Sequence, residues 1–197
     1  MSSDDPRMLA REAHYQRFLG PMNDNVMHST DVKPVHIDIY QFEPTEERPY
    51  WTLITGGMSD QRQIQPEDCA EHMSPRSEIM MYVTEPKPWM FDVLKGLAEM
   101  PFDHDTFLHW WHTVPNGKPM TAEPSELTSY FFVPPYFEAV EFGDLKIEDD
   151  LVDVLLLIPI TDSERAYARQ HGSQAFEKLI EKVDLSPVVD ESRTSIV

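Results

Sequence analysis

The segment YWTLITGGMSD, residues 50–60, is the part of the sequence most informative about the fold. Its aromatic and β-branched residues are typical of a strand, and the strand ends at two adjacent glycines. Glycine tolerates a positive φ and a close backbone neighbour, so Gly56 and Gly57 predict a tight exit from the strand. We expect Ser59 and Asp60 to cap the backbone amides that this turn leaves free.

Two further strands are predicted around this segment. Residues 35–42 alternate, with Val35, Ile37 and Ile39 on one face, which indicates a half-buried strand. Residues 77–84 are rich in apolar and β-forming side chains and indicate a third strand, while the polar residues 59–76 are typical of a loop. We expect the three strands to be antiparallel.

Capping residues and apolar spacing predict four helices. The first two are expected over residues 7–19 and 89–99. Thr161 and Glu164 fit a capping box that starts the third helix, and Gly172 is expected to end it. Ser173 is then expected to cap the fourth.

The order of these elements predicts an α+β (mixed α/β) fold, with helices packed on a twisted, largely antiparallel sheet. Residues 130–133 and 153–158 supply two later strands, and the continuous apolar run of the second indicates a central strand buried on both faces. We expect a single domain over residues 1–185. The polar residues 186–197 are expected to form a frayed C-terminal tail.

The charge of the chain favours basic protein partners and argues against nucleic acid. Asp and Glu number 35 against 16 Lys and Arg, which leaves a formal net charge of −19. Such a field repels phosphate backbones and attracts basic surfaces. An acidic surface that serves solubility alone remains an alternative.

The sequence also favours a cytoplasmic location without membrane association. Cys69 is the single cysteine, so no internal disulfide is possible and a reducing compartment fits. The acidic N-terminus lacks the basic and apolar order of a secretory signal. The longest apolar run, residues 154–160, is far shorter than the ~20 residues that span a bilayer.

The segment FDHDTFLHWWH, residues 102–112, is the main candidate for chemistry. Imidazole and carboxylate are ligands for zinc or iron, and His109 and His112 would share a face if the segment were helical. A metal-dependent hydrolase is therefore the alternative function. It would use Asp103, His104, Asp105, His109 or His112.

Two non-catalytic interpretations of the same segment compete with the metal site. In one, the aromatic residues pack an edge of the core and the polar residues only make hydrogen bonds. In the other, Trp110 and Trp111 contact a protein partner together with His109 and His112, and Asp60 beside the glycine turn is a second contact.

Other catalytic templates are missing from the sequence. Gly56 and Gly57 lack the third glycine of a dinucleotide site, and the chain has no phosphate-binding loop and no nucleophile elbow. We therefore predict no catalytic residue, no metal and no cofactor. A non-enzymatic binding protein is the leading interpretation, and an oligomerising subunit without a ligand is a further one.

Three segments together resemble matching segments of the Suppressor of fused family, in the same order and at similar separations. They are residues 50–60, SEIMMYVTEPKPWMFDVLKGLAEM at residues 77–100, and VDVLLLIPITDSERAYARQHGSQAFEKLI at residues 152–180. The resemblance implies a mixed α/β domain, in agreement with the predicted elements. The animal members of this family are two-domain regulators that sequester the zinc-finger transcription factors of Hedgehog signalling. This chain is similar only to their N-terminal domain.

The resemblance also limits which function is carried over. The family's peptide-binding aspartate lies just before a Trp-His pair, whereas Trp111 and His112 here follow Phe107 and Leu108. Hedgehog-type peptide binding is therefore not expected. Stand-alone members resembling this chain are typical of bacteria and often occur beside polymorphic toxins. This implies an immunity or regulatory protein that sequesters a basic partner such as a toxin.

Overall fold

The computed structural model describes residues 5–28, 34–70, 72–121 and 125–197. The strands are β1 (Met27–His28), β2 (Asp38–Phe42), β3 (Trp51–Gly56), β4 (Ser77–Val83), β5 (Thr113–Pro115), β6 (Leu127–Val133), β7 (Lys146–Ile147), β8 (Asp150–Leu151), β9 (Asp153–Thr161) and β10 (Val188–Val189). The α-helices are α1 (Pro6–Leu19), α2 (Pro88–Asp103), α3 (Asp162–His171) and α4 (Ser173–Lys182). Short 3-10 turns cover Met58–Asp60 and Val140–Asp144.

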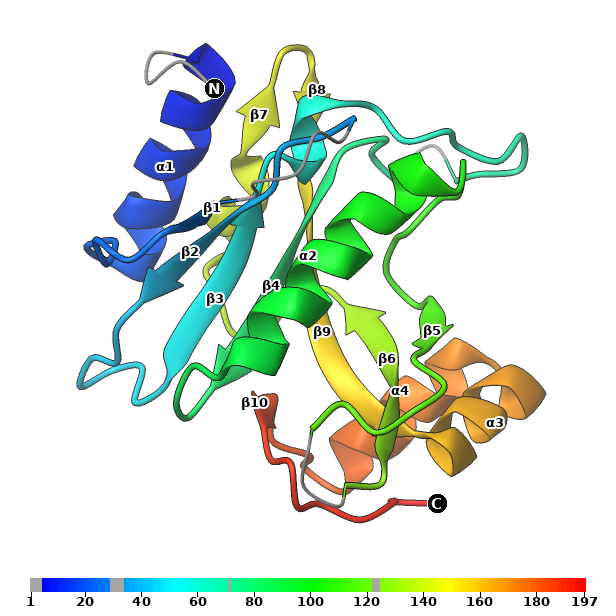
Figure 1. The fold of residues 1–197 in the computed structure, drawn as a ribbon. Coiled ribbons are helices and arrows are strands. Elements are labelled where there is room, and N and C mark those ends of the chain that lie inside the picture. The colour runs from blue at the N-terminus through cyan, green and yellow to red at the C-terminus, as the bar shows by residue number, and fades with distance from the viewer. Residues whose placement is uncertain (1–4, 29–33, 71, 122–124) are drawn as a thin grey trace.

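Within these residues the strands form one mixed sheet and one small hairpin (Figure 1). The order in the mixed sheet is β1-β2-β3-β4-β9-β6-β5, and β10 lies beside β4, while β7 pairs with β8 apart from the sheet. Neighbouring strands of the sheet run antiparallel except at β4–β9 and β4–β10. This confirms the predicted α+β fold with a largely antiparallel sheet.

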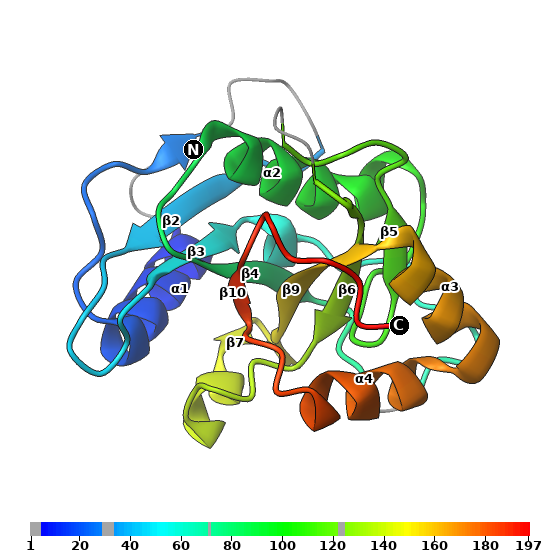
Figure 2. The same cartoon turned by 90° about the horizontal axis from the view of Figure 1, so that it is seen from below.

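Helices cover both faces of the sheet (Figure 2). Helix α2 lies on one face, where Leu94 and Ala98 pack into a core cluster with strand residues. Helices α1 and α4 lie on the opposite face, where Tyr15 and Phe176 pack into a second cluster. The apolar core is therefore two layers with the sheet between them.

Strand β9 is the central strand, as its apolar run predicts. It pairs in parallel with β4 and antiparallel with β6, and Leu155 and Leu156 enter opposite core clusters. The strand continues to Thr161, past the predicted end at residue 158. Pro159 pairs opposite Tyr130 of β6, beyond the stretch that pairs with β4. Because β9 has a ladder partner on one side only at this point, the proline is tolerated.

Strand β2 differs from the prediction of a half-buried strand, because both of its faces are buried. Ile37 and Ile39 face α2, in the predicted register. Tyr40 and Phe42 lie on the other face, in the same cluster as Tyr15 of α1. The sequence of the strand alone did not show that α1 would cover this face.

The exit from β3 confirms the predicted glycine turn. Gly57 has a φ of 108°. A Cβ at Gly57 would overlap the carbonyl oxygen of His36, and one at Gly56 would overlap the ring of Tyr40. Both glycines are therefore required by the close approach of β2.

The cap of this turn differs from the prediction, since the donors are held by Glu78 of β4 and not by Ser59 and Asp60. The Glu78 carboxylate accepts hydrogen bonds from the backbone amides of Gly57 and Ser59, each at 3.0 Å, and from the Ser59 hydroxyl at 2.6 Å. Its other oxygen accepts from the Thr55 hydroxyl at 2.6 Å. Glu78 is fully buried, so its charge is balanced inside the protein.

The balancing charge is Arg11 of α1, which is also fully buried. Its Nε lies 3.7 Å from Glu78 Oε1, and its Nη1 donates to Asp60 Oδ1 and, at 3.3 Å, to Ser59 Oγ. Burial acts to lower the pKa of Arg11, but Glu78 and Asp60 outweigh it and the pKa is raised. Helix α1 is therefore attached to the sheet through a buried ion pair at the glycine turn.

The helices agree with the prediction except at two ends. Asp5 caps α1, and Thr161 and Glu164 form the capping box of α3, as expected. Helix α2 runs past the predicted end at residue 99 and through Pro101 to Asp103. Helix α4 takes Gly172 as its N-cap, and the Ser173 hydroxyl instead donates to the carbonyl oxygen of Trp111 at 2.7 Å.

The C-terminal residues 186–197 are packed on the sheet, so the expectation of a frayed tail is wrong. Val188 and Val189 pair in parallel with β4. Arg193 then forms an ion pair with the fully buried Glu164, with Nη1 to Oε1 at 2.6 Å and Nη2 to Oε2 at 2.8 Å. The Glu164 carboxylate accepts from the Thr161 amide within its own helix cap and also from Arg193, so it joins the C-terminal residues to α3.

Among the described residues, no helix has the length and apolar character that crossing a membrane requires.

Replacing Glu78 tests the buried pair at the glycine turn. Glu78→Gln places an amide nitrogen where the turn offers donors, and it removes one of the two carboxylates that balance the buried Arg11, leaving only Asp60. We expect a loss of about 3 kcal/mol in the free energy of unfolding, measured by urea denaturation followed through tryptophan fluorescence. The exposed Glu47→Gln is the control and should change it by less than about 0.5 kcal/mol. Equal effects of the two substitutions would refute the structural role of Glu78.

Removing Arg193 tests the attachment of the tail. Arg193→Ala leaves Glu164 buried without its partner, so we expect a loss of about 3 kcal/mol at neutral pH, against about 0.5 kcal/mol or less for the exposed Arg169→Ala. Burial acts to raise the pKa of Glu164, but Arg193 and the Thr161 amide outweigh it, and the pKa is lowered.

The acid dependence of the same variant follows from that shift. Because the folded pKa is below the unfolded value, Glu164 stabilises the fold above the unfolded pKa and ceases to do so as pH falls through the folded one. The difference between wild type and Arg193→Ala should therefore shrink in urea titrations below about pH 4. A difference that stays constant to low pH would show that the pair is not its source.

Candidate partner-binding site

The segment 102–112 does not bring its histidines and aspartates together. Asp103 ends α2, His104 is its C-cap, and Asp105 follows in the left-handed region with a φ of 50°. His104 and Asp105 are exposed, whereas His109 is fully buried. No three side chains of this described segment place ligand atoms around one point. The geometry therefore does not support the metal-dependent hydrolase that was the alternative function.

His109 is a structural residue of the core edge. Its Nε2 lies 2.6 Å from Asp153 Oδ2 at the start of β9, and the Asp153 carboxylate also accepts from the Ser74 amide at 2.7 Å. The segment is not helical here, and the backbone N–H of His109 donates to Nδ1 of His112 at 3.3 Å. His109 has no exposed surface, so it cannot contact a partner directly in this structure.

The two tryptophans lie on opposite faces of the sheet. Trp110 packs against the cluster under α2, and its indole N–H donates to the carbonyl oxygen of Val154 at 2.9 Å. Trp111 has a φ of 70° and packs against the cluster under α1 and α4. Both are half-buried, as in the core-packing interpretation, and they do not form one exposed aromatic surface.

Asp60 lies in the glycine turn and is used within the fold. Its carboxylate accepts from Arg11 and lies 4.0 Å from the guanidinium of Arg7, and its side chain is 10% exposed. The turn is joined to the aromatic segment by Gln63, whose side chain accepts from the Leu108 amide at 2.8 Å and donates to its carbonyl oxygen at 3.3 Å. The structure thus assigns Asp60 an internal ion pair.

A groove beside α4 combines an apolar floor with an acidic rim. It has a volume of about 390 Å³. Its floor is formed by apolar residues of β6, β9, α4 and the following loop, namely Val133, Leu156, Ile158, Ile180, Leu185 and Pro187. This volume lies within the range of about 300 to 1,000 Å³ typical of ligand sites. We call this depression the α4 groove.

Two exposed aromatic side chains line the α4 groove. Tyr136 is 57% exposed and Phe137 is 59% exposed, which is unusual for rings of this size. The Tyr136 hydroxyl donates to the Glu177 carboxylate across the groove. Burial and the charge of Glu177 raise the pKa of Tyr136. An exposed aromatic pair beside an apolar floor is typical of a protein-contact surface.

The rim of the α4 groove is acidic. Glu177, Glu181 and Asp184 line it, and none of the described residues that line it is basic. Glu177 and Glu181 are one helical turn apart on α4, with Ile180 between them, so the acids and the apolar floor share one face of the helix. A basic segment with an apolar residue would be complementary in both charge and polarity.

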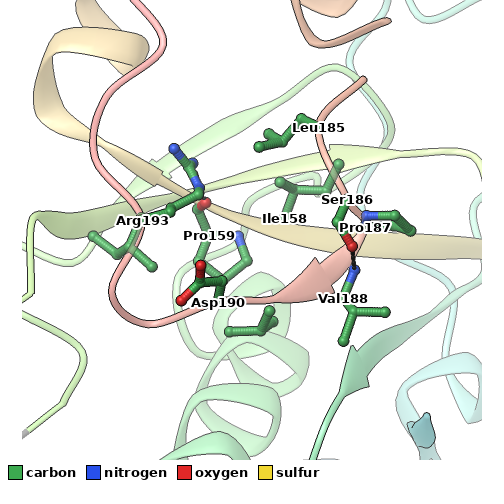
Figure 3. Close-up of a pocket in the computed structure, with 10 residues that line it drawn as sticks. Ile158, Pro159, Leu185, Ser186, Pro187, Val188, Asp190 and Arg193 are labelled. Carbon is green, nitrogen blue, oxygen red and sulfur yellow. Dashed lines mark hydrogen bonds between the residues drawn. The ribbon is translucent and has the colours of Figure 1, made fainter. Parts of the chain in front are cut away.

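A smaller pocket of about 100 Å³ adjoins the α4 groove (Figure 3). The two share Ile158, Leu185 and Pro187. Figure 3 shows Leu185, Ser186 and Pro187, which follow α4, on one side of this pocket. Asp190 and Arg193 lie on its other side. Arg193 also donates to the carbonyl oxygen of Pro159 at 2.6 Å. The wall of this surface therefore depends on the packed tail.

The α4 groove is not evident from the sequence. Its only signals there are the Tyr136-Phe137 pair after two prolines and the Glu177, Ile180, Glu181 spacing of the last helix. These signals do not point to one site by themselves, because only the fold brings residues 133–137 next to residues 177–187.

The comparisons with known proteins identify one family. The sequence profile of the Suppressor of fused protein family (SUFU) matches residues 33–194. No curated protein matches the chain.

Solved structures of similar fold carry the same family name. A Suppressor of fused homologue from Neisseria gonorrhoeae has a TM-score of 0.74 and 18% identity, with 97% of this chain and 96% of that chain covered. The Sufu–Fu complex has a TM-score of 0.67 and 16% identity, with 97% and 92% covered. Drosophila Suppressor of fused has a TM-score of 0.66 and 14% identity, and the match covers 97% of this chain but 51% of the Drosophila chain. At these identities the likeness shows the fold.

The half-buried His112 provides a test of the core edge through pH. Burial, with a smaller contribution from His109, lowers the pKa of His112. The unfolded chain then binds a proton at higher pH than the folded one, so the stability due to neutral His112 is present above the unfolded pKa and is lost as pH falls through the folded pKa.

The free energy of unfolding of wild type should therefore fall as the pH is lowered from about 7 to 5. We expect a smaller fall in His112→Gln. Urea titrations at several pH values measure this slope. The exposed His104→Gln is the control and should keep the wild-type slope. An unchanged slope in His112→Gln would contradict the assignment.

Proposed function

Because the chain belongs to the Suppressor of fused family, we propose that it is a non-enzymatic protein-binding domain that holds a basic partner in the α4 groove. The observation that carries this proposal is the combination of an apolar floor, exposed Tyr136 and Phe137, and an acidic rim. The likeness to a structure of the Sufu–Fu complex supports a binding role. The domain is proposed to span residues 1–185, with residues 186–197 supporting the groove wall.

The partner proposed is a basic protein such as a toxin. The net charge of −19 accelerates the approach of a positively charged surface. Glu181 and Asp184 would pair with its Lys or Arg side chains, while an apolar side chain would enter between Tyr136 and Ile180. On this proposal the chain is an immunity or regulatory protein of the bacterial type and acts in the cytoplasm by sequestration.

The half-exposed Trp110, Trp111 and His112 are retained as a second proposed contact region. The indole of Trp110 is tied to Val154, so this region is pre-organised rather than free to rearrange. Its residues are split between the two faces of the sheet, so we expect it to contribute less than the α4 groove.

The test is capture of a partner from the source organism by variants with matched charge. Glu181→Lys with Asp184→Asn reduces the negative charge of the rim, and asparagine suits the left-handed backbone of residue 184, whose φ is 52°. The control, Glu46→Lys with Glu47→Gln, makes the same change in net charge at an exposed loop.

We expect the rim variant to weaken the affinity for the captured protein about tenfold or more, and the control to leave it within about twofold. Phe137→Ala should weaken it by a similar factor. Binding should also weaken as salt is raised. Equal binding by rim variant, Phe137→Ala and control would exclude the α4 groove, and capture of no protein at all would count against a binding function.

A further inference from the structure

Three potential metal ligands meet at the β1–β2 edge of the sheet, far along the chain from the segment 102–112. His28 of β1 and Asp38 of β2 are directly opposite each other in the antiparallel ladder. His36 precedes Asp38 by two positions in extended chain, so its side chain points to the same face of the sheet. Strand pairing therefore places two imidazoles and one carboxylate together.

The distances among these groups resemble those of ligands around one ion. Asp38 Oδ1 lies 2.7 Å from His28 Nδ1 and 3.1 Å from His36 Nε2, and the three ligand atoms lie within 4.8 Å of one another. Ligands bound to zinc at about 2.0 to 2.1 Å are roughly 3 Å apart. Small shifts of the two imidazoles would open the central position for an ion.

The burial of the three groups suits a site that is fixed at its base and open to solvent. The side chain of Asp38 is 6% exposed, whereas those of His36 and His28 are 33% and 64% exposed. A buried carboxylate gives one immobile ligand, and the two exposed rings leave a path for an ion to enter. The strongly negative chain also raises the local concentration of cations.

A structural explanation for the same distances is that both imidazoles donate hydrogen bonds to Asp38. That arrangement needs a proton on His28 Nδ1 and on His36 Nε2. It predicts no effect of divalent metals on the protein. Metal binding instead requires both nitrogens to offer lone pairs, so the two explanations differ in a measurable way.

We propose that His28, His36 and Asp38 form a binding site for a first-row divalent transition ion, with zinc as the representative. Two imidazoles and a carboxylate suit zinc, cobalt, nickel or copper, whereas calcium and magnesium prefer oxygen ligands throughout. Three protein ligands leave at least one coordination position for water or for a side chain of another molecule. The site is independent of the α4 groove and of the proposed binding function.

The test is titration of the purified full chain with zinc by calorimetry and with cobalt by visible absorption. We expect wild type to bind one equivalent. His36→Gln and Asp38→Asn should weaken binding roughly a hundredfold, and so should His28→Gln, whose exposed position makes folding of that variant secure. His104→Gln removes an exposed histidine outside the cluster and should bind as wild type does.

Thermal unfolding provides a second measurement on the same proteins. Zinc should raise the melting temperature of wild type and His104→Gln and leave that of the three cluster variants unchanged, because an ion that binds only the folded chain stabilises it. The proposal is overturned if wild type binds neither ion, or if binding and the thermal shift survive substitution of the three residues.

Discussion

The buried carboxylate of Glu78 is the group on which the arrangement of the first half of the chain depends. It holds the amides of Gly57 and Ser59 at the glycine turn and the Thr55 hydroxyl of β3, and it faces Arg11 of α1. A buried charge without partners would cost several kcal/mol, so these elements must come together for the fold to form. Strand, turn and helix are thereby attached at one point, and the glycines are needed because β2 passes close by.

A second buried carboxylate plays the corresponding part in the other half. Glu164 caps α3 and binds Arg193, which brings the C-terminal residues across the end of β9. This contact positions the loop that borders the α4 groove. Glu78 and Glu164 are thus both paired with arginine inside the protein, while Glu181 and Asp184 are exposed at the rim of the α4 groove. These exposed acids contribute to the negative field of the surface.

Prediction from the sequence was most successful where local chemistry dominates. The Thr161–Glu164 capping box, the Asp5 cap and the apolar run of β9 each identified an element, because caps and periodicity act over a few residues. It was least successful for contacts between distant segments. The role of Glu78, the ion pair of Arg193 and the burial of both faces of β2 involve residues separated by many positions, and no local pattern reports them.

The family, the fold class and the acidic character of the chain follow from its sequence, since motifs and periodicity are local patterns and composition needs no structure. Which polar groups are available depends on the folded chain. The tertiary structure placed His109 and Asp60 in internal contacts, packed Trp110 and Trp111 against different core clusters, and assembled the α4 groove from β6, β9 and α4. The reason is physical: exposure and proximity depend on which strands pair and which helix covers each face, and pairing is a long-range property of the folded chain.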